Sequence, residues 1–157
     1  MGLSGERMVK TTWIGDVQNG QHTGQTVELM GWIKRTRGNN NLRFVVLRDS
    51  TGTIQCVGKK TNLGEELFDV LKGAIIETSV VFTGTVRADD RAEGGHELDV
   101  TGVEVVGAVN SERPFPITEA DMLVEDEDGE LTYGGTEHTL NHRHLYLRTT
   151  RATTMLK

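Results

Sequence analysis

Apolar and polar residues alternate along residues 26–57, in three short runs that are separated by two polar turns. Each run keeps its apolar residues on one face, as Val27, Leu29 and Ile33, then Val45 and Leu47, then Ile54 and Cys56. Such a period of two is typical of half-buried strands. The turns at 38–41 and 49–52 are rich in residues that accept left-handed backbone angles. The pattern predicts a three-stranded antiparallel meander with one apolar face.

The opposite face of this meander carries unusual side chains. If Val45 points into the core, Phe44 must point outward, and Gln55 is outward on the next strand, beside Phe44 in a simple register. Arg35 and Arg37 end the preceding strand. This set suits an unstacked nucleotide, because the ring can stack on a base, the amide can read its edge and the guanidinium groups can bind phosphates. An edge aromatic covered by a loop or by a missing domain is the alternative.

The pattern changes to a helical one after residue 61. Asn62 is placed as an N-cap with Glu65 at the acidic third position, and Gly73 as a C-cap glycine. The apolar residues between them have helical spacing and are Leu63, Leu67, Val70 and Leu71. These signals predict one helix of about ten residues.

Two more strands follow the helix. The first is predicted at residues 78–87, where every second residue, Val80, Phe82, Gly84 and Val86, lies on the same face. After a charged turn, a strand from His96 to about Val106 has Leu98 and Val100 inward, with Glu97 and Asp99 outward. Three strands, a helix and two strands form the order of the OB-fold, so we expect an all-β class with one helix, a five-stranded Greek-key barrel. That fold commonly binds oligonucleotides on its second and third strands.

The chain divides into four regions by composition. Residues 1–12 form a polar leader, and 13–109 form the barrel, with Trp13–Val17 packing on it as a short segment. Residues 110–140 read as a linker or hinge, extended at 113–117 because of its prolines and acidic at 121–135. Residues 141–157 resemble the opening of a larger domain.

The formal net charge is −6, which argues against general nucleic-acid binding, so any such recognition must be local or completed by a part of the protein outside this sequence. No apolar run is long enough to span a bilayer, and the first ten residues lack a signal-peptide pattern, so we expect no membrane contact and a cytoplasmic location. The single Cys56 cannot form an internal disulfide, and its inward phase predicts a buried structural thiol.

No catalytic constellation is present in the sequence, since glycine-rich phosphate loops and elbow-type serines are missing. His138, His142 and His144 are read as surface or hinge residues rather than metal ligands. The 125–130 stretch fails the calcium-loop pattern, whose twelfth position would be Gly135. We therefore expect no catalytic residue, metal or cofactor in this chain. Glu97 can pair with Arg35 or Arg87, or accept a hydrogen bond from a base.

A string of motifs in order resembles the N-terminal anticodon-binding domain of class IIb aminoacyl-tRNA synthetases, the aspartyl, asparaginyl and lysyl enzymes. These motifs are Gly31-Trp32-Ile33 with Arg35 and Arg37, Phe44-x-x-Leu47-Arg48-Asp49, Gly52-x-Ile54-Gln55, Gly84-Thr85-Val86-Arg87, Gly95-His96-Glu97-Leu98, Pro114-Phe115-Pro116-Ile117 and Asn141–Arg148. The resemblance runs from about Trp13 to the C-terminus. Residues 143–148, Arg-His-Leu-Tyr-Leu-Arg, are similar to the asparaginyl members, with the aspartyl members as runner-up.

The resemblance implies roles for specific residues. Phe44 would stack on the central anticodon uridine, Gln55 would read its edge, Arg37 would help to fix it, and Glu97 would contact the first anticodon base. Arg35 is included among the tRNA-contacting residues. The partner would be a tRNA anticodon loop. The parent enzyme, a homodimer, would use ATP and magnesium in a class II catalytic domain that this chain lacks.

Two rival hypotheses remain open at this stage. One is a free-standing OB-fold module for tRNA or single-stranded nucleic acid, and the other is a structural or protein-interaction barrel.

Overall fold

The computed structural model describes residues 12–112, 123–125, 131–133 and 140–155 of the 157-residue chain. The chain divides into two compact units, Met1–Ser111 and Glu112–Lys157. The candidate site lies in the first of them.

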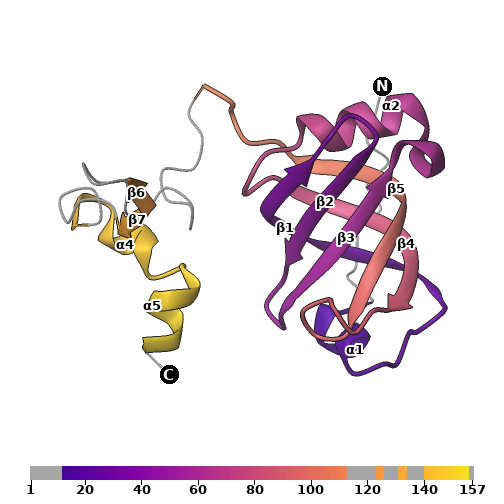
Figure 1. Cartoon of the computed structure of the whole chain (residues 1–157), viewed down its shortest axis with the longest axis horizontal. Helices are drawn as coiled ribbons and strands as arrows, with labels where there is room; N and C mark the ends of the chain where they lie inside the picture. The colour runs from indigo at the N-terminus through magenta and orange to yellow at the C-terminus, as the bar shows by residue number, and fades with distance from the viewer. Residues whose placement is uncertain (1–11, 113–122, 126–130, 134–139, 156–157) are drawn as a thin grey trace. The chain divides into compact units, whose positions relative to one another are not determined.

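The first unit is a closed five-stranded barrel (Figure 1). Its elements are α1 (Ile14–Gln18), β1 (Thr26–Gly38), β2 (Leu42–Arg48), β3 (Thr53–Lys59), α2 (Lys60–Gly73), β4 (Ser79–Ala88) and β5 (His96–Gly107). The strand order around the barrel is β1-β2-β3-β5-β4, with β3 and β5 parallel and the other neighbours antiparallel. This topology confirms the predicted OB-fold.

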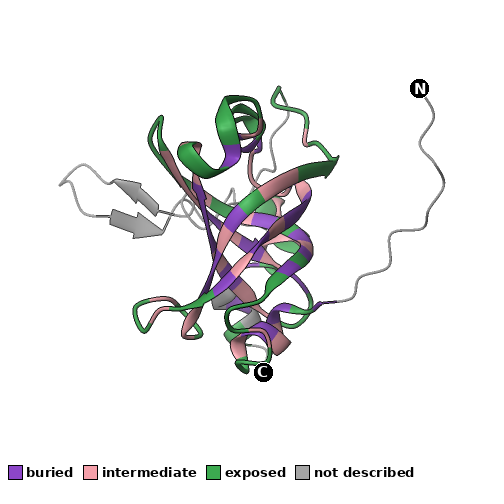
Figure 2. Cartoon of the chain, turned by 90° about the vertical axis from the view of Figure 1, so that its right-hand side faces the viewer, coloured by how far each residue is buried: buried purple, intermediate pink, exposed green. Residues whose placement is uncertain are grey.

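The core of the barrel consists of the residues that the alternation placed inward. Figure 2 shows these buried positions alternating along the strands with more exposed ones. The strand residues in this core are Val27, Leu29, Ile33, Val45, Leu47, Ile54, Cys56, Val80, Phe82, Val86, Leu98 and Val100. The two helices cover opposite ends of the barrel (Figure 1) and add Ile14, Val17, Leu63, Phe68 and Leu71 to the same core. The buried thiol of Cys56 is confirmed.

A β-bulge in β1 sets the direction of the arginines. The register against β2 shifts between Ile33 and Arg35, so Lys34 is the additional residue. An uninterrupted alternation from the buried Ile33 would turn Arg35 and Arg37 inward. The bulge instead brings Thr36 opposite the buried Val45, which leaves Arg35 and Arg37 on the outward face.

Helix α2 differs from the prediction at both of its ends. It begins at Lys60 with Lys59 as its N-cap, so Asn62 is not the cap; the Asn62 amide instead donates to Asp99 Oδ1 at 3.5 Å. Gly73 belongs to the helix and Ala74 follows it in an extended conformation, so the predicted C-cap glycine is wrong. The helix is interrupted at Gly64, where φ is 76° and ψ is 171°. Only a glycine adopts such angles without strain.

Helix α1 is fixed to the turn between β2 and β3. The Ile14 backbone N–H donates to Asp49 Oδ2 at 3.0 Å, and the Gly15 N–H donates to Thr51 Oγ1 at 2.9 Å. The other carboxylate oxygen of Asp49 accepts hydrogen bonds from the backbone N–H groups of Thr51 and Gly52. One aspartate therefore closes the predicted turn and caps the helix that covers this end of the barrel.

In the second unit, β6 (Leu123–Glu125) pairs antiparallel with β7 (Leu131–Tyr133), and α4 (Arg143–Tyr146) and α5 (Thr150–Met155) are short helices. The polar leader up to residue 11, the extended linker at 113–117, most of the acidic stretch and His138 lie outside the described residues. Among the helices that the structure describes, none combines the length and hydropathy needed to cross a bilayer.

Candidate nucleic-acid interface

The candidate site is built on the outward face of β1, β2 and β3. Arg37 is the direct cross-strand partner of Phe44, and Phe44 in turn lies opposite Val57. Gln55 lies opposite Val46, so it is diagonal to Phe44 rather than directly beside it. The aromatic ring and the amide therefore lie on one face as diagonal neighbours on adjacent strands.

Strand β5 extends this face with a carboxylate. Because β3 and β5 run parallel, Glu97 is the register partner of Gln55. Glu97 and Asp99 point outward while Leu98 and Val100 are buried in the core, as the alternation predicted. The amide and the carboxylate thus lie on neighbouring strands of the same surface.

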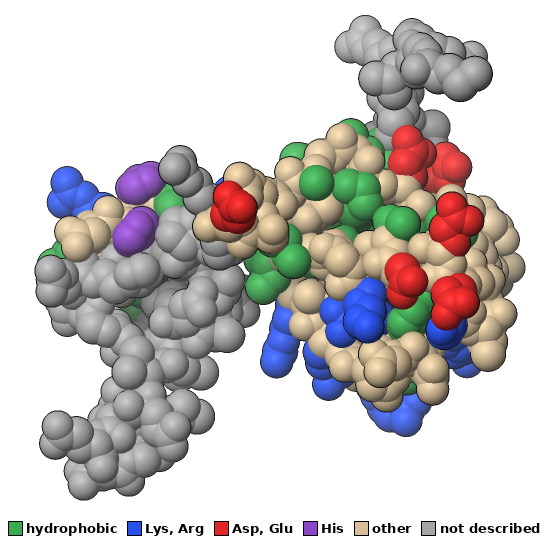
Figure 3. Space-filling model, turned by 90° about the horizontal axis from the view of Figure 1, so that it is seen from above, with side chains coloured by type: hydrophobic (Ala, Val, Ile, Leu, Met, Phe, Trp, Pro, Cys, Tyr) green, Lys and Arg blue, Asp and Glu red, His purple; other side chains and the backbone are tan. Residues whose placement is uncertain are grey.

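These side chains line one open hollow of about 450 Å³. Its lining residues are Arg37, Leu42, Phe44, Gln55, Val57, Lys59, Asp89, Arg91, Ala92 and Glu97. Four of the five residues expected from the sequence meet there. Arg35 does not line the hollow; it is exposed on the same face, opposite Val46. Acidic and basic side chains lie close together on the barrel unit (Figure 3).

The Phe44 ring has a cation beside it. The guanidinium carbon of Arg37 lies 5.0 Å from the ring centroid, which is within the range of a cation–π interaction. Phe44 is half-buried, so part of its surface stays accessible within the hollow. The contact limits the orientations of both side chains before any ligand binds.

Glu97 is 8% exposed and makes no hydrogen bond or ion pair with any other residue that the structure describes. The ion pair with Arg87 that the sequence left open is not formed, because Arg87 Nη1 lies 3.7 Å from Asp99 Oδ2. Lys59 Nζ lies 3.4 Å from the same oxygen. Asp99 thus takes both neighbouring cations, and the Glu97 carboxylate faces the hollow with acceptor capacity to spare.

Sequence reasoning missed three charged residues of the hollow. Lys59 could have been found, since it continues the outward phase of Gln55 and Val57 along β3. Asp89 and Arg91 lie in the loop between β4 and β5. The alternation of apolar and polar residues predicts side-chain directions only within strands. Nothing in the sequence therefore placed these two loop residues beside Phe44.

The chemistry available in the hollow is that of binding. It contains an aromatic platform, an amide that both donates and accepts, an acceptor carboxylate and cationic donors. Across the described part of the chain, no three His, Cys, Asp or Glu residues are grouped as metal ligands would be. Burial raises the pKa of the Cys56 thiol, because the thiolate would lose its hydration, and this thiol lies inside the barrel rather than in the hollow.

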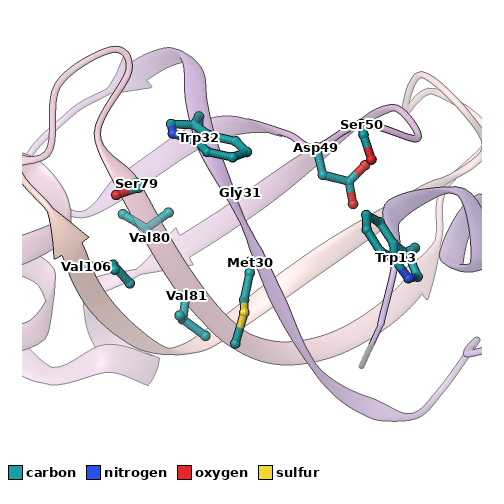
Figure 4. Close-up of a pocket in the computed structure, with 10 residues that line it drawn as sticks. All are labelled: Trp13, Met30, Gly31, Trp32, Asp49, Ser50, Ser79, Val80, Val81 and Val106. Carbon is teal, nitrogen blue, oxygen red and sulfur yellow. The ribbon is translucent and has the colours of Figure 1, made fainter. Parts of the chain in front are cut away.

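A second hollow, of about 380 Å³, lies over β1, β4 and the end of β5 (Figure 4). It is mainly apolar and is lined by Trp13, Met30, Gly31, Trp32, Asp49, Ser50, Ser79, Val80, Val81 and Val106. It shares no lining residue with the hollow at Phe44. Its exposed Trp32 provides an aromatic side chain for comparison with Phe44.

Comparison with known families matches residues 27–106 to the family described as OB-fold nucleic acid binding domain. Among curated proteins, the asparagine–tRNA ligase of Koribacter versatilis is 41% identical over 88% of this chain and 28% of its own length. That of Chloroflexus aurantiacus is 37% identical over 87% of this chain and 28% of its own length. The chain thus spans less than a third of the length of these relatives.

The chain is also similar to solved structures of aminoacyl-tRNA synthetases. The asparaginyl-tRNA synthetase from Pyrococcus horikoshii complexed with asparaginyl-adenylate has a TM-score of 0.70 and 34% identity, over 95% of this chain and 31% of that one. The aspartyl tRNA synthetase from Entamoeba histolytica has a TM-score of 0.76 and 20% identity, over 97% of this chain and 36% of that one. The second likeness supports the fold alone.

Proposed function

The chain belongs to the family of OB-fold nucleic acid binding domains, and from this premise we propose that its barrel binds the anticodon loop of a tRNA, as the N-terminal domain of an asparagine–tRNA ligase. The observation that carries the proposal is the single hollow that combines Phe44, Gln55, Arg37 and Glu97. These side chains suit single-stranded RNA, whose unstacked bases expose both a face and a hydrogen-bonding edge.

Each side chain has a base for which its chemistry fits. The Phe44 ring stacks on the central anticodon uridine, and the Gln55 amide pairs its donor and its acceptor with the uracil O4 and N3–H. Arg37, already in contact with the Phe44 ring, fixes the stacked base. The Glu97 carboxylate can only accept, so it suits the N1–H and amino group of a guanine in the first anticodon position.

The asparaginyl assignment rests on the relatives. The curated asparagine–tRNA ligases named above share 41% and 37% identity with the chain, and the asparaginyl structure from Pyrococcus horikoshii shares 34%. The segment Arg143–Arg148 carries the asparaginyl type of sequence. An aspartate–tRNA ligase domain is the alternative, and the two anticodons, GUU and GUC, share their first two bases.

The parent reaction would activate asparagine with ATP and transfer it to the 3′ end of the tRNA. ATP and magnesium would bind in the catalytic domain of a cytoplasmic, homodimeric enzyme. None of the residues in the hollow supplies that chemistry. The role of this chain would be selection of the tRNA.

The test is binding of the chain to anticodon stem-loops with the sequences GUU, GUC and GCU, measured for the wild type and for Phe44→Ala. We expect the wild type to prefer the two loops with central U. Base stacking on an aromatic ring contributes roughly 1–3 kcal/mol, so Phe44→Ala should weaken this binding about 5- to 150-fold. A ratio of GUU to GUC affinity above one favours the asparaginyl assignment.

Trp32→Ala is the matched control. It removes an exposed aromatic side chain from the same barrel, in the apolar hollow that is separate from Phe44. We expect it to leave the preference for central U unchanged. Equal binding of all three loops by the wild type would contradict the proposal, as would an equal loss in both variants.

A further inference from the structure

The loop between β4 and β5 holds an arginine at the hollow. Its ends are joined by a hydrogen bond from the Asp89 N–H to the Gly95 carbonyl oxygen at 3.0 Å. Within it, the Ala92 N–H donates to the Asp89 carbonyl and the Gly95 N–H donates to the Ala92 carbonyl, both at 2.9 Å. Asp89, Arg91 and Ala92 line the hollow together with Phe44. The loop therefore has a fixed backbone on which Arg91 is presented.

The Arg91 guanidinium is held on one edge only. Its Nε donates to Asp89 Oδ1 and its Nη2 to Asp89 Oδ2, each at 3.1 Å, and the Arg91 backbone N–H donates to Oδ1 at 2.9 Å. These hydrogen bonds hold the pKa of the Asp89 carboxyl below its usual value, so the pair stays ionised at neutral pH. The Arg91 side chain is 91% exposed. Its Nη1 donors are not used by this fork and remain available to a ligand.

An exposed ion pair of this kind contributes little to stability. The guanidinium edge that Asp89 leaves open is, however, well suited to bind a phosphate, because one N–H of Nη1 and the second N–H of Nη2 are parallel donors that match two phosphate oxygens. The hollow receives three cations from three elements, Arg37 from β1, Lys59 from β3 and Arg91 from the loop. They gather there although the net charge of the chain is −6.

Resting on the proposed function, we propose that Arg91 contacts a backbone phosphate of the RNA strand whose base stacks on Phe44. Asp89 is then a positioning residue, which holds the guanidinium in the orientation that meets the phosphate. This contact carries no base preference, since phosphates are the same at every nucleotide.

The first test is Arg91→Gln, with the affinity for GUU and GCU loops measured from 50 to 300 mM salt. We expect a loss of about 3- to 10-fold that is equal for both loops, and a salt slope of log K that is smaller by about 0.7, the value for one single-strand phosphate contact. Lys60→Gln is the matched control. Lys60 forms an exposed ion pair with Glu65 at 2.7 Å and does not line the hollow, so its slope should stay at the wild-type value.

Asp89→Asn tests the positioning role by the sign of its effect. The asparagine oxygen can still accept the Arg91 backbone N–H, so the loop is preserved while the charged fork is weakened. Simple electrostatics predicts tighter RNA binding, because a negative charge is removed. If Asp89 positions the Arg91 guanidinium, Asp89→Asn should instead weaken RNA binding about 3-fold. Added to Arg91→Gln, the same substitution should cause no such loss.

The outcomes separate the two proposals. If the wild type prefers central U but Arg91→Gln keeps both affinity and slope, the phosphate contact is wrong and the anticodon role stands. A changed base preference in Arg91→Gln would also overturn it, since a base reader behaves in that way. Tighter binding by Asp89→Asn would overturn the positioning role. Loss of any loop preference in the wild type would instead refute the anticodon proposal itself.

Discussion

Glu97 has fewer polar partners than its neighbour Asp99. A carboxylate that loses most of its water needs hydrogen bonds or an opposite charge in compensation. Glu97 is 8% exposed and forms no hydrogen bond or ion pair with the residues that the structure describes, although its charge interacts with that of Arg91; the neighbouring Asp99 has Lys59, Arg87 and Asn62. Such an imbalance is typical of a position kept for a ligand rather than for stability.

Glu97→Gln should therefore separate stability from recognition. The variant keeps the size of the side chain and removes a largely buried charge that has no hydrogen bond or ion pair among the described residues, so we expect the free energy of unfolding to stay level or rise by about 1 kcal/mol. Affinity for a GUU loop should fall at least tenfold relative to an AUU loop, about 1.4 kcal/mol of discrimination. Urea unfolding and loop titrations measure both. A marked loss of stability without a change in preference for G would mean that Glu97 is structural.

Cys56 gives a pH dependence of known sign. The folded barrel raises the pKa of this thiol through burial, with a smaller contribution from the Glu97 charge, while the unfolded thiol ionises near its ordinary value of about 8.5. Below that pH both states are protonated and stability is complete. Above it only the unfolded chain releases the proton, so unfolding becomes more favourable as the pH rises.

We therefore expect wild type to lose about 2 kcal/mol more than Cys56→Ala between pH 8 and pH 10 in urea unfolding. Lysine and tyrosine residues titrate in both proteins, so the difference between them isolates the thiol. Parallel pH profiles would show that the Cys56 thiolate is tolerated inside the barrel.

At the scale of elements, the sequence predicted the strands well and their irregularities poorly. Alternation located all five strands, because one face of each is buried in the barrel core. It gave no signal for the bulge at Lys34, since a bulge depends on pairing with β2 and not on the hydrophobicity of β1 itself. The sequence groups Arg35 and Arg37 with this face only by their place at the end of the strand, and the bulge supplies the physical reason for their direction.

The ends of α2 were mispredicted for a related reason. Capping residues are a local signal, whereas packing on the barrel decides where the helix begins. Leu63, Phe68 and Leu71 must all reach the core, and Gly64 accommodates this through its left-handed backbone. At Gly58 of β3 a Cβ would lie 2.3 Å from Leu71 Cδ2, so the strand has no room for a side chain under the helix.

Two glycines of α2 should respond to alanine with opposite signs. Gly64 has φ at +76°, so Gly64→Ala should destabilise the barrel by about 1–2 kcal/mol through backbone strain. Gly73 is helical with open space around its Cβ position, so Gly73→Ala should stabilise it by about 0.5–1 kcal/mol. Urea midpoints of the two variants provide the comparison. Equal effects would mean that the break at Gly64 is absent in solution.

At the scale of the molecule, the hollow at Phe44 lies within one of the two units. Every residue of the hollow lies between Arg37 and Glu97, inside the first unit. The barrel in that unit has its own core, formed by its five strands and by α1 and α2. A chain of residues 12–111 should accordingly unfold in one cooperative transition and keep the wild-type loop preference. Loss of that preference in a folded truncation would show that the second unit contributes to the site.

Some residues of the site are brought together only by the fold of the whole barrel, and these are harder to predict from the sequence. Phe44, Gln55 and Glu97 came from strand phase, which is a local property. The closeness of Arg91 to Phe44 comes from the barrel closure that brings β5 beside β3, and this is a property of the whole fold. Charged residues in loops are therefore the part of such a site that a single sequence hides.

The most direct test asks which surface touches the central anticodon base. A GUU stem-loop with 4-thiouridine at the central position would be photocrosslinked to the chain, and the tryptic peptides identified by mass spectrometry. We expect the crosslink in the peptide of residues 44–48, which begins at Phe44 and is released by cleavage after Arg43 and Arg48. A crosslink in residues 11–34 instead, the peptide that contains both Trp13 and Trp32, would contradict the account and assign the RNA to the apolar hollow.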